Sequence, residues 1–312
     1  MSAGKEPEGP RHGVGAGFAD ALSFAFADAA VELCGLVRLS VSDPGAEPSR
    51  PLHAAALVLG AGGRAPVALH GQAPGEPPQG WDELLTGERG LGARAFPSGE
   101  GWSLQASGPG ARLELQFEPL APAAATGFPE VPSGAHGLEL EVQPGRVQGT
   151  LEVDGAEAKL HAVAQRTREW GAPDWKRLSL VRSLGLWQED GGGALALAAR
   201  PAGAAGHGEE STAGFVFAPE PPAAVPIADA RLSATTDAGG ALVRAGLELW
   251  EGEDSDFPRR AGGQAVTGAE LPTAGMSLTC SFLRGWMDGH AAVGVYRVLA
   301  PEGSAGGRAG ER

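Results

Sequence analysis

The chain has 312 residues, with 38 acidic and 24 basic side chains and a formal net charge of −14. A chain of this length favours two domains over one and can bury a sizeable core. An acidic surface repels phosphate backbones, and no dense run of Lys and Arg is present, so the composition argues against nucleic-acid binding.

Nothing in the sequence predicts export or insertion into a membrane. Residues 1–17 are polar and glycine-rich and lack the basic and apolar regions of a signal peptide. No stretch of about 18 apolar residues is present, so no membrane-spanning helix is expected. Cys34 and Cys280 form no metal-binding pattern and are predicted to be buried thiols in a reducing compartment. We therefore expect a soluble, cytoplasmic protein with disordered tails at 1–17 and 301–312.

Apolar and polar residues alternate with a period of two through much of the chain. Residues 111–118 place Leu113, Leu115 and Phe117 on one face and polar or charged residues on the other. The pattern predicts strands with one dry and one wet face, as in antiparallel sheets. Asp-Gly pairs at 154–155 and 288–289 stand between such runs and are typical of tight hairpin turns.

Many short strands separated by regular turns indicate a β-sandwich or β-barrel rather than an alternating β-α fold. One short helical turn is predicted from Trp81 to Leu85, and the boundary between the two halves is predicted near 165–176. The predicted strands, in chain order, are 22–28, 31–41, 52–59, 65–70, 101–106, 111–118, 137–143, 146–153, 156–165, 177–187, 193–199, 213–218, 226–233, 240–250, 263–270, 276–285 and 291–299.

Familiar catalytic and cofactor-binding signatures are absent. The sequence has no nucleophile elbow, zinc-protease motif or P-loop, and the LVLGAGG run around Gly60 lacks the following helix of a dinucleotide-binding loop. The seven histidines have no metal-ligand spacing, so neither a metal nor a cofactor is expected. His161 is the best functional candidate among them, because it lies on the polar face of a predicted strand.

Residues 166–175 form the most informative segment. They read R-T-R-E-W-G-A-P-D-W and directly follow a clear hairpin pattern. One interpretation is the floor of a ligand cavity, in which Trp170 and Trp175 form apolar walls and stabilise a cation. In that case Glu169 or Asp174 would exchange a proton with the ligand if burial raised its pKa.

The alternative interpretation of this segment is a structural corner. Trp170 would then plug the end of a barrel, and Arg166 or Arg168 would pair with Asp174. The sequence alone supports the two interpretations equally.

The order of strand, Asp-Gly turn, strand and R-x-x-x-W-G-x-x-D-W resembles the superfamily of carotenoid 1,2-hydratase (hydroxyneurosporene synthase), AttH and tocopherol cyclase-like proteins. Their linking segment commonly reads R-D-H-S-W-G-x-R-D-W, and the matching positions here are Arg166, Trp170, Gly171, Asp174 and Trp175. The run from Gly294 to Arg297 is similar to the family's final strand but lacks its acid. The resemblance implies two antiparallel lipocalin-like (calycin-type) β-barrel halves packed together, over residues 18–170 and 171–300.

The chain departs from the family pattern where the family handles protons. Thr167 stands in place of Asp, Arg168 in place of His, Glu169 in place of Ser and Pro173 in place of Arg. The His–Asp pair that the resemblance would supply is therefore missing, and a proton donor must come from Glu169 or Asp174.

Several residues of the second half are weaker candidates. Trp187 and Trp250 end apolar strands, where they would line the mouth of the second barrel or plug its core. Arg182 interrupts an apolar face, and it would bind an acidic ligand head or pair with Glu248.

The first functional hypothesis is an enzyme of hydratase, cyclase or isomerase type that protonates an isoprenoid- or lipid-like molecule inside a β-barrel cavity. Its partner would be an apolar small molecule, without metal or nucleotide. A non-catalytic carrier of hydrophobic ligands on the same scaffold is the second hypothesis, and a β-sandwich interaction or carbohydrate-binding module is the third.

The predicted acids are Asp174 and Glu169, and the predicted ligand contacts are His161, Arg166, Arg168, Trp170, Trp175, Arg182, Trp187, Glu248 and Trp250. Nothing in the sequence indicates an oligomeric state.

Overall fold

The structure of the chain is a computed structural model. It describes residues 9–10, 17–43, 51–61, 63–76, 78–83, 85–86, 90–128, 137–252, 255–273 and 275–303. Most of the two expected tails, 1–17 and 301–312, lies outside the described residues.

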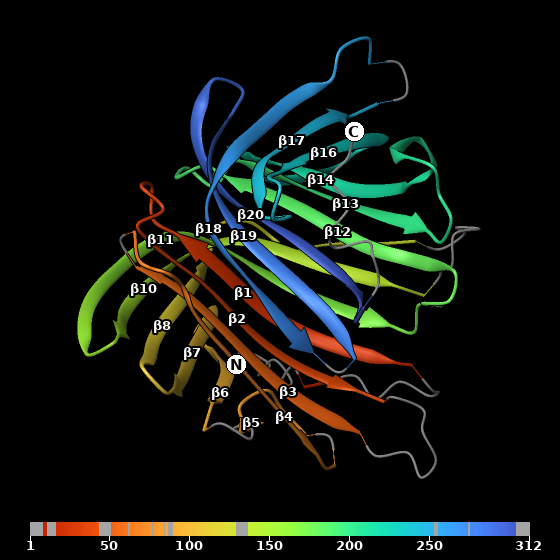
Figure 1. The fold of residues 1–312 in the computed structure, drawn as a ribbon. Coiled ribbons are helices and arrows are strands. Elements are labelled where there is room, and N and C mark those ends of the chain that lie inside the picture. Colours follow the sequence, from red (N-terminus) through yellow and green to blue (C-terminus); the bar gives the residue numbers. More distant parts are fainter. Residues whose placement is uncertain are drawn as a thin grey trace, which may run out of the picture.

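The described residues form two antiparallel sheets, which curve around separate interiors (Figure 1). The first sheet has the order β4-β3-β2-β1-β11-β10-β8-β7-β6-β5, with β9 paired to β10. Its strands are β1 (Ala19–Ala27), β2 (Leu33–Ser42), β3 (Leu52–Ala61), β4 (Val67–Pro74), β5 (Leu85–Thr86), β6 (Gly92–Ser98), β7 (Gly101–Gly108), β8 (Ala111–Pro119), β9 (Ala124–Gly127), β10 (Glu139–Val153) and β11 (Ala156–Gly171).

The second sheet has the order β15-β14-β13-β12-β20-β19-β18-β17-β16. Its strands are β12 (Leu178–Trp187), β13 (Gly193–Pro201), β14 (Ser211–Pro219), β15 (Pro222–Pro226), β16 (Asp229–Thr236), β17 (Leu242–Trp250), β18 (Arg259–Thr273), β19 (Met276–Met287) and β20 (His290–Pro301). A single turn of 3₁₀-helix, η1 (His207–Glu209), precedes β14.

Each sheet curls so that its two ends approach each other, which makes two barrel-like halves. In the first sheet the end strand β5 contacts β3 and β4, and in the second the end strand β16 contacts β13 and β14. The predicted all-β fold of two antiparallel, lipocalin-like halves packed together is therefore confirmed.

Three apolar clusters fill the molecule, one inside each half and one between the halves. The interior of the first half is filled by side chains that include Phe24, Trp81 and Phe117. The third cluster combines residues of both sheets, among them Leu36 of β2 and Phe282 of β19. The halves are thus filled with side chains, and the prediction of a cavity inside a barrel is not supported by the packing of these interiors.

Strand β1 shows why the interface between the halves is dry. Leu22, Phe24 and Phe26 pack inside the first half, whereas Ala25 and Ala27 pack against the second sheet. Because successive side chains of a strand point to opposite faces, a strand that is buried on both faces is mainly apolar on both.

The turn chemistry was predicted correctly. Asp154 and Gly155 have φ angles of 52° and 79°, and Asp288 and Gly289 have φ angles of 52° and 83°. Two successive residues with positive φ are characteristic of the type I′ hairpin, for which Asp-Gly is a preferred sequence.

Several details of the strand prediction were wrong. The two strands predicted at 137–143 and 146–153 are one continuous strand, β10, and four short strands, β5, β6, β9 and β15, were missed. No helix forms in the described part of the segment from Trp81 to Leu85, because residues 81–82 form a single turn, residue 83 is a bend and Leu85 begins β5. Trp81 is instead buried in the first half.

Both cysteines are free thiols buried in the apolar cluster between the sheets, as predicted for their burial. Burial in this apolar layer raises the pKa of Cys280 to about 12, and burial together with the proximity of Cys280 raises the pKa of Cys34 to about 12. A thiol that stays protonated is a poor nucleophile.

We expect Phe282→Ala to lower the free energy of unfolding by about 3–5 kcal/mol, because it leaves a cavity between the sheets. Phe282 is 1% exposed, whereas Phe257, the matched control, is 87% exposed. Denaturant unfolding should show a large loss for Phe282→Ala and little change for Phe257→Ala. Equal losses for both variants would contradict the proposed packing.

Native protein is expected to resist alkylation at neutral pH, because both thiols are buried and protonated. Iodoacetamide followed by intact-mass analysis should label neither cysteine without denaturant and both cysteines in urea. Rapid labelling of the native protein would show that Cys34 or Cys280 is accessible.

Candidate functional site: a pocket between the two sheets

A pocket of about 180 Å³ lies between the two sheets, near the segment that connects β11 to β12. It is lined by β1, β2, β10 and β11 of the first sheet and by β12, β13, β19 and β20 of the second. Its walls are mainly apolar, formed by Phe18, Ala19, Ala21, Leu138, Leu140, Trp170, Pro173, Trp175, Val181, Leu197, Met276, Leu278 and Leu299.

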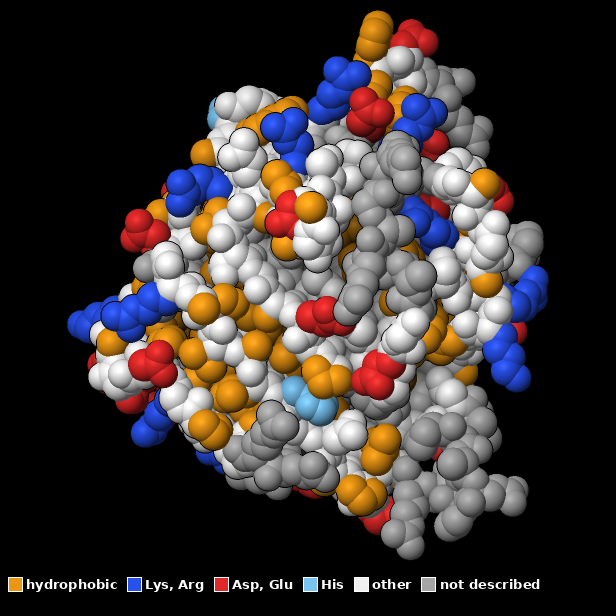
Figure 2. All heavy atoms as spheres, in the orientation of Figure 1, with side chains coloured by type: hydrophobic (Ala, Val, Ile, Leu, Met, Phe, Trp, Pro, Cys, Tyr) orange, Lys and Arg blue, Asp and Glu red, His pale blue; other side chains and the backbone are white. Residues whose placement is uncertain are grey.

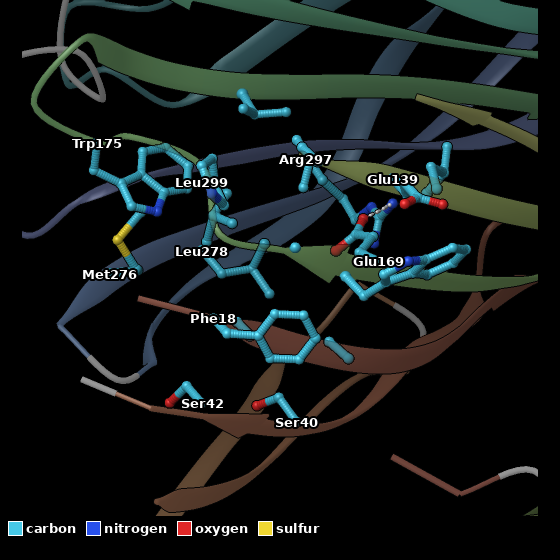
Figure 3. Close-up of a pocket in the computed structure, with 18 of the residues that line it drawn as sticks. Phe18, Ser40, Ser42, Glu139, Glu169, Trp175, Met276, Leu278, Arg297 and Leu299 are labelled. Carbon is cyan, nitrogen blue, oxygen red and sulfur yellow. Dashed lines mark ion pairs between the residues drawn. The ribbon is translucent and has the colours of Figure 1, made fainter. Parts of the chain in front are cut away.

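The pocket has an apolar end and a polar end (Figure 3). Trp175, Met276 and Leu278 lie together at one end, and Glu169 and Arg297 lie at the other. Such an arrangement of apolar walls with a few polar groups is typical of small-molecule sites.

Glu169 is held at the polar end by two arginines from different sheets. Its Oε2 lies 2.8 Å from Nη1 of Arg38 on β2, and its Oε1 lies 2.7 Å from Nη2 of Arg297 on β20. Both arginine side chains are almost completely buried. The strand register places Glu169 here, because alternate residues of β11 face the second sheet.

Hydroxyl groups hold the two arginines in place. Arg38 Nη1 also donates to Oγ of Ser23, at 3.1 Å. Arg297 donates from Nε to Oγ of Ser183, at 3.3 Å, and from Nη1 to Oγ1 of Thr167, at 3.4 Å. The polar end is therefore a connected network that joins both sheets.

Glu169 is ionised at neutral pH, which corrects the prediction that burial would make it an acid. Burial does act to raise its pKa, but the nearby charges and hydrogen bonds of Arg297 and Arg38 outweigh burial and lower the pKa from 4.5 to about 2. A carboxyl group with this pKa carries no proton to donate at pH 7.

Asp174, the other predicted acid, has a different role. It is exposed and does not line the pocket, although Pro173 and Trp175 on either side of it do. Its Oδ1 accepts a hydrogen bond from the backbone N–H of Lys176, at 3.0 Å. We therefore assign Asp174 to the turn between β11 and β12 and not to the pocket.

Arg166 and Arg168 point to the opposite face of β11 from Glu169. Arg168 pairs with the buried Asp20, at 2.8 Å, and Arg166 pairs with Glu141, at 2.7 Å. The expected partner, Asp174, is thus wrong for both arginines. Both side chains are buried on the face of β11 that points into the first half, and neither lines the pocket between the sheets.

The structure places both tryptophans of the segment at the pocket. Trp170 is buried, and Cζ of Arg168 lies 5.9 Å from the centre of the Trp170 ring. Trp175 is half-buried. Gly171 between them has a φ of 139°, and a Cβ there would overlap the carbonyl oxygen of Gly137. An enclosed wall of this kind differs from the exposed aromatic platform of a carbohydrate-binding module.

Arg182 forms a buried ion pair inside the second half. Its Nη2 lies 2.6 Å from Oε2 of Glu210, and both side chains are 2% exposed. The predicted pairing with Glu248 is wrong, because Glu248 pairs with Arg260 on the exterior, at 3.1 Å.

The remaining candidates lie away from this pocket. Trp187 is buried between the sheets and donates from Nε1 to Oε1 of Gln165, at 2.5 Å. Trp250 packs under Arg231 on the exterior of the second sheet, with Cζ 5.0 Å from the ring centre. His161 is exposed and lines a separate pocket together with Arg146 and His290, among other residues.

Sequence reasoning missed Arg38 and Arg297, the two residues that define the polar end. Arg38 interrupts the mainly apolar strand β2, which reads LCGLVRLSVS. Arg297 interrupts the mainly apolar strand β20, which reads HAAVGVYRVLAP. A lone arginine within a strand that is buried on both faces requires a partner, and that is the signal that the sequence offered.

No metal-binding group of three or more His, Cys, Asp or Glu side chains occurs within the residues that the structure describes. Within the same residues, no helix has the length and apolar character needed to cross a membrane. On the face shown in Figure 2, acidic and basic side chains are interspersed among apolar and neutral ones.

No model of a known protein family and no curated protein sequence matches the chain. Solved structures share its fold. A protein of Nitrosomonas europaea with the provisional name AttH has a TM-score of 0.67 at 13% identity, over 91% of this chain and 92% of the other.

Two further structures support the same fold. CghA has a TM-score of 0.59 at 13% identity, over 92% of this chain and 89% of CghA. Kievitone hydratase from Nectria haematococca has a TM-score of 0.52 at 12% identity, over 91% of this chain and 89% of the hydratase. The chain therefore has the two-sheet, lipocalin-like fold of these proteins.

We expect Glu169→Gln to destabilise the protein by about 3–5 kcal/mol at pH 7, because it removes the charge that compensates two buried arginines. The pKa of Glu169 is lower in the folded protein than its ordinary value, so its stabilising effect is complete above about pH 4.5 and is lost as the pH falls towards 2.

Denaturant unfolding at several pH values measures this effect. The difference between wild type and Glu169→Gln should shrink steadily below pH 4.5. The control is Glu114→Gln, which removes a carboxylate from an exposed pair with Arg112 and should have little effect. A difference that does not depend on pH would argue against an ionised Glu169.

Proposed function

We propose that the protein is an enzyme of hydratase type that acts on an apolar, unsaturated small molecule bound between the two sheets. The observation that carries the proposal is the pocket of apolar side chains that ends at a partly buried carboxylate held by Arg38 and Arg297. The name of one solved structure with this fold, kievitone hydratase, supports the same kind of reaction.

The reaction adds a proton to one carbon of a double bond and the hydroxyl of water to the other. Trp170 and Trp175 would stabilise positive charge that develops on the substrate, because the face of an indole attracts cations. The ionised Glu169 would hold the attacking water by accepting its hydrogen bond. The added proton would come from solvent water that reaches the pocket beside the exposed Glu139, and the attacking water would return one proton to the solvent, so that the elements of one water are added overall.

A second candidate function is a carrier or sensor that binds the same class of molecule without transforming it. The observation that favours it is the pairing of Glu169 with two arginines, which keeps this carboxylate ionised and unable to donate a proton. The two functions share the ligand site and differ only in whether a product forms.

Water labelled with heavy oxygen distinguishes the two functions. Purified protein is incubated with a panel of prenylated phenols and unsaturated terpenoids in labelled water, and the extract is analysed by mass spectrometry. A product that has gained one labelled water supports the hydratase. A ligand that is retained by the protein but unchanged supports the carrier.

Two variants test whether the ligand lies in this pocket. Trp175→Ala removes a wall, and Met276→Trp fills the apolar end, so each should weaken ligand binding by about tenfold or more. Trp286→Ala is the matched control, since Trp286 is 49% exposed and does not line the pocket. Unchanged binding in both pocket variants, or no retained ligand from the whole panel, would overturn the proposal.

A further inference from the structure

The polar end of the pocket carries more positive than negative charge. Arg38 and Arg297 contribute two positive charges, and Glu169 compensates one of them. Both arginines are almost completely buried between the sheets, where an unbalanced charge interacts strongly with a ligand.

The other charged groups that line the pocket do not cancel this excess. Arg182 directs its guanidinium into the second half, where it pairs with Glu210. Asp43 is only partly buried and Glu139 is exposed, so solvent and salt screen both carboxylates.

The arginines also retain hydrogen-bonding capacity. Arg38 uses Nη1 for both Ser23 and Glu169, and its buried Nε has no acceptor among the described residues. Nη2 of Arg297 lies 2.7 Å from Oε1 of Glu169. A buried donor without an acceptor costs about 1–3 kcal/mol, and a ligand oxygen that accepts from it recovers this free energy.

We propose that the pocket takes an amphiphile with a carboxylate head, which binds at Arg38 and Arg297 while its apolar body lies along Trp175, Met276 and Leu278. The inference rests on the proposed function, because it concerns the same pocket, and it adds the charge class of the ligand. Charge-assisted hydrogen bonds to arginine are stronger than those of a neutral hydroxyl group, so an acid is preferred over the corresponding alcohol.

The test compares a medium-chain fatty acid with the primary alcohol of the same chain length, both below their micelle-forming concentrations at pH 7. Binding is measured by isothermal titration calorimetry with the full-length chain. We expect the acid to bind at least about tenfold more tightly than the alcohol, which corresponds to one charge-assisted hydrogen bond.

Three variants test the assignment of the arginines. Arg297→Gln and Arg38→Gln should each weaken binding of the acid by about tenfold and leave the alcohol nearly unchanged. Glu169→Gln removes the competing carboxylate and should tighten binding of the acid, a change in the opposite direction. Arg112→Gln is the control, because Arg112 is exposed and pairs with Glu114 far from the pocket lining. Circular dichroism confirms that each variant is folded before titration.

The outcomes separate this inference from the proposed function. If acid and alcohol bind equally, the carboxylate preference is overturned and the pocket function stands. If the acid is preferred but the preference survives Arg297→Gln, Arg38→Gln and Glu169→Gln unchanged, the assignment of the arginines is overturned. If neither molecule binds, both the inference and the proposed ligand site fail.

Discussion

The ion cluster of Arg38, Glu169 and Arg297 constrains how the two sheets pack. Its members come from both sheets and lie in an apolar layer, so separating the sheets locally would leave charges buried without partners. Breaking a buried pair costs roughly 3–5 kcal/mol, more than most single apolar contacts. The same cluster forms the polar end of the pocket, so the packing of the halves and the character of the ligand site depend on one interaction.

Strand β11 shows how alternation lets one segment serve two environments. Arg166 and Arg168 point into the first half and pair with carboxylates there, whereas Thr167 and Glu169 point towards the second sheet and contact Arg297. A shift of the register by one residue would exchange the two sets, and every charge would lose its partner. The polar residues of β11 therefore specify its register more strictly than apolar residues alone would.

Most strands and both Asp-Gly hairpins could be predicted from the sequence, because alternation and turn chemistry are local properties. The missed strands β6 and β15 contain prolines, which are typical of turns and strand edges, and β9 has only four residues. The site could be predicted only in part. Trp170 and Trp175 were found from composition, but the partner of Glu169 is Arg38, which lies 131 residues away. Such a pairing depends on strand order and on the packing of the sheets, and no local pattern contains either.

Two residues at the polar end of the pocket differ from the pattern of the family that the sequence resembles. The family pattern has Ser where this chain has Glu169, and an acid on the final strand where this chain has Arg297. In this structure the two residues meet at 2.7 Å, which places the carboxylate of Glu169 between the sheets. Arg38 adds a second positive charge beside this ion pair. The shape of the pocket thus follows from the fold, whereas its charge, and with it the class of ligand, follows from residues that the fold does not prescribe.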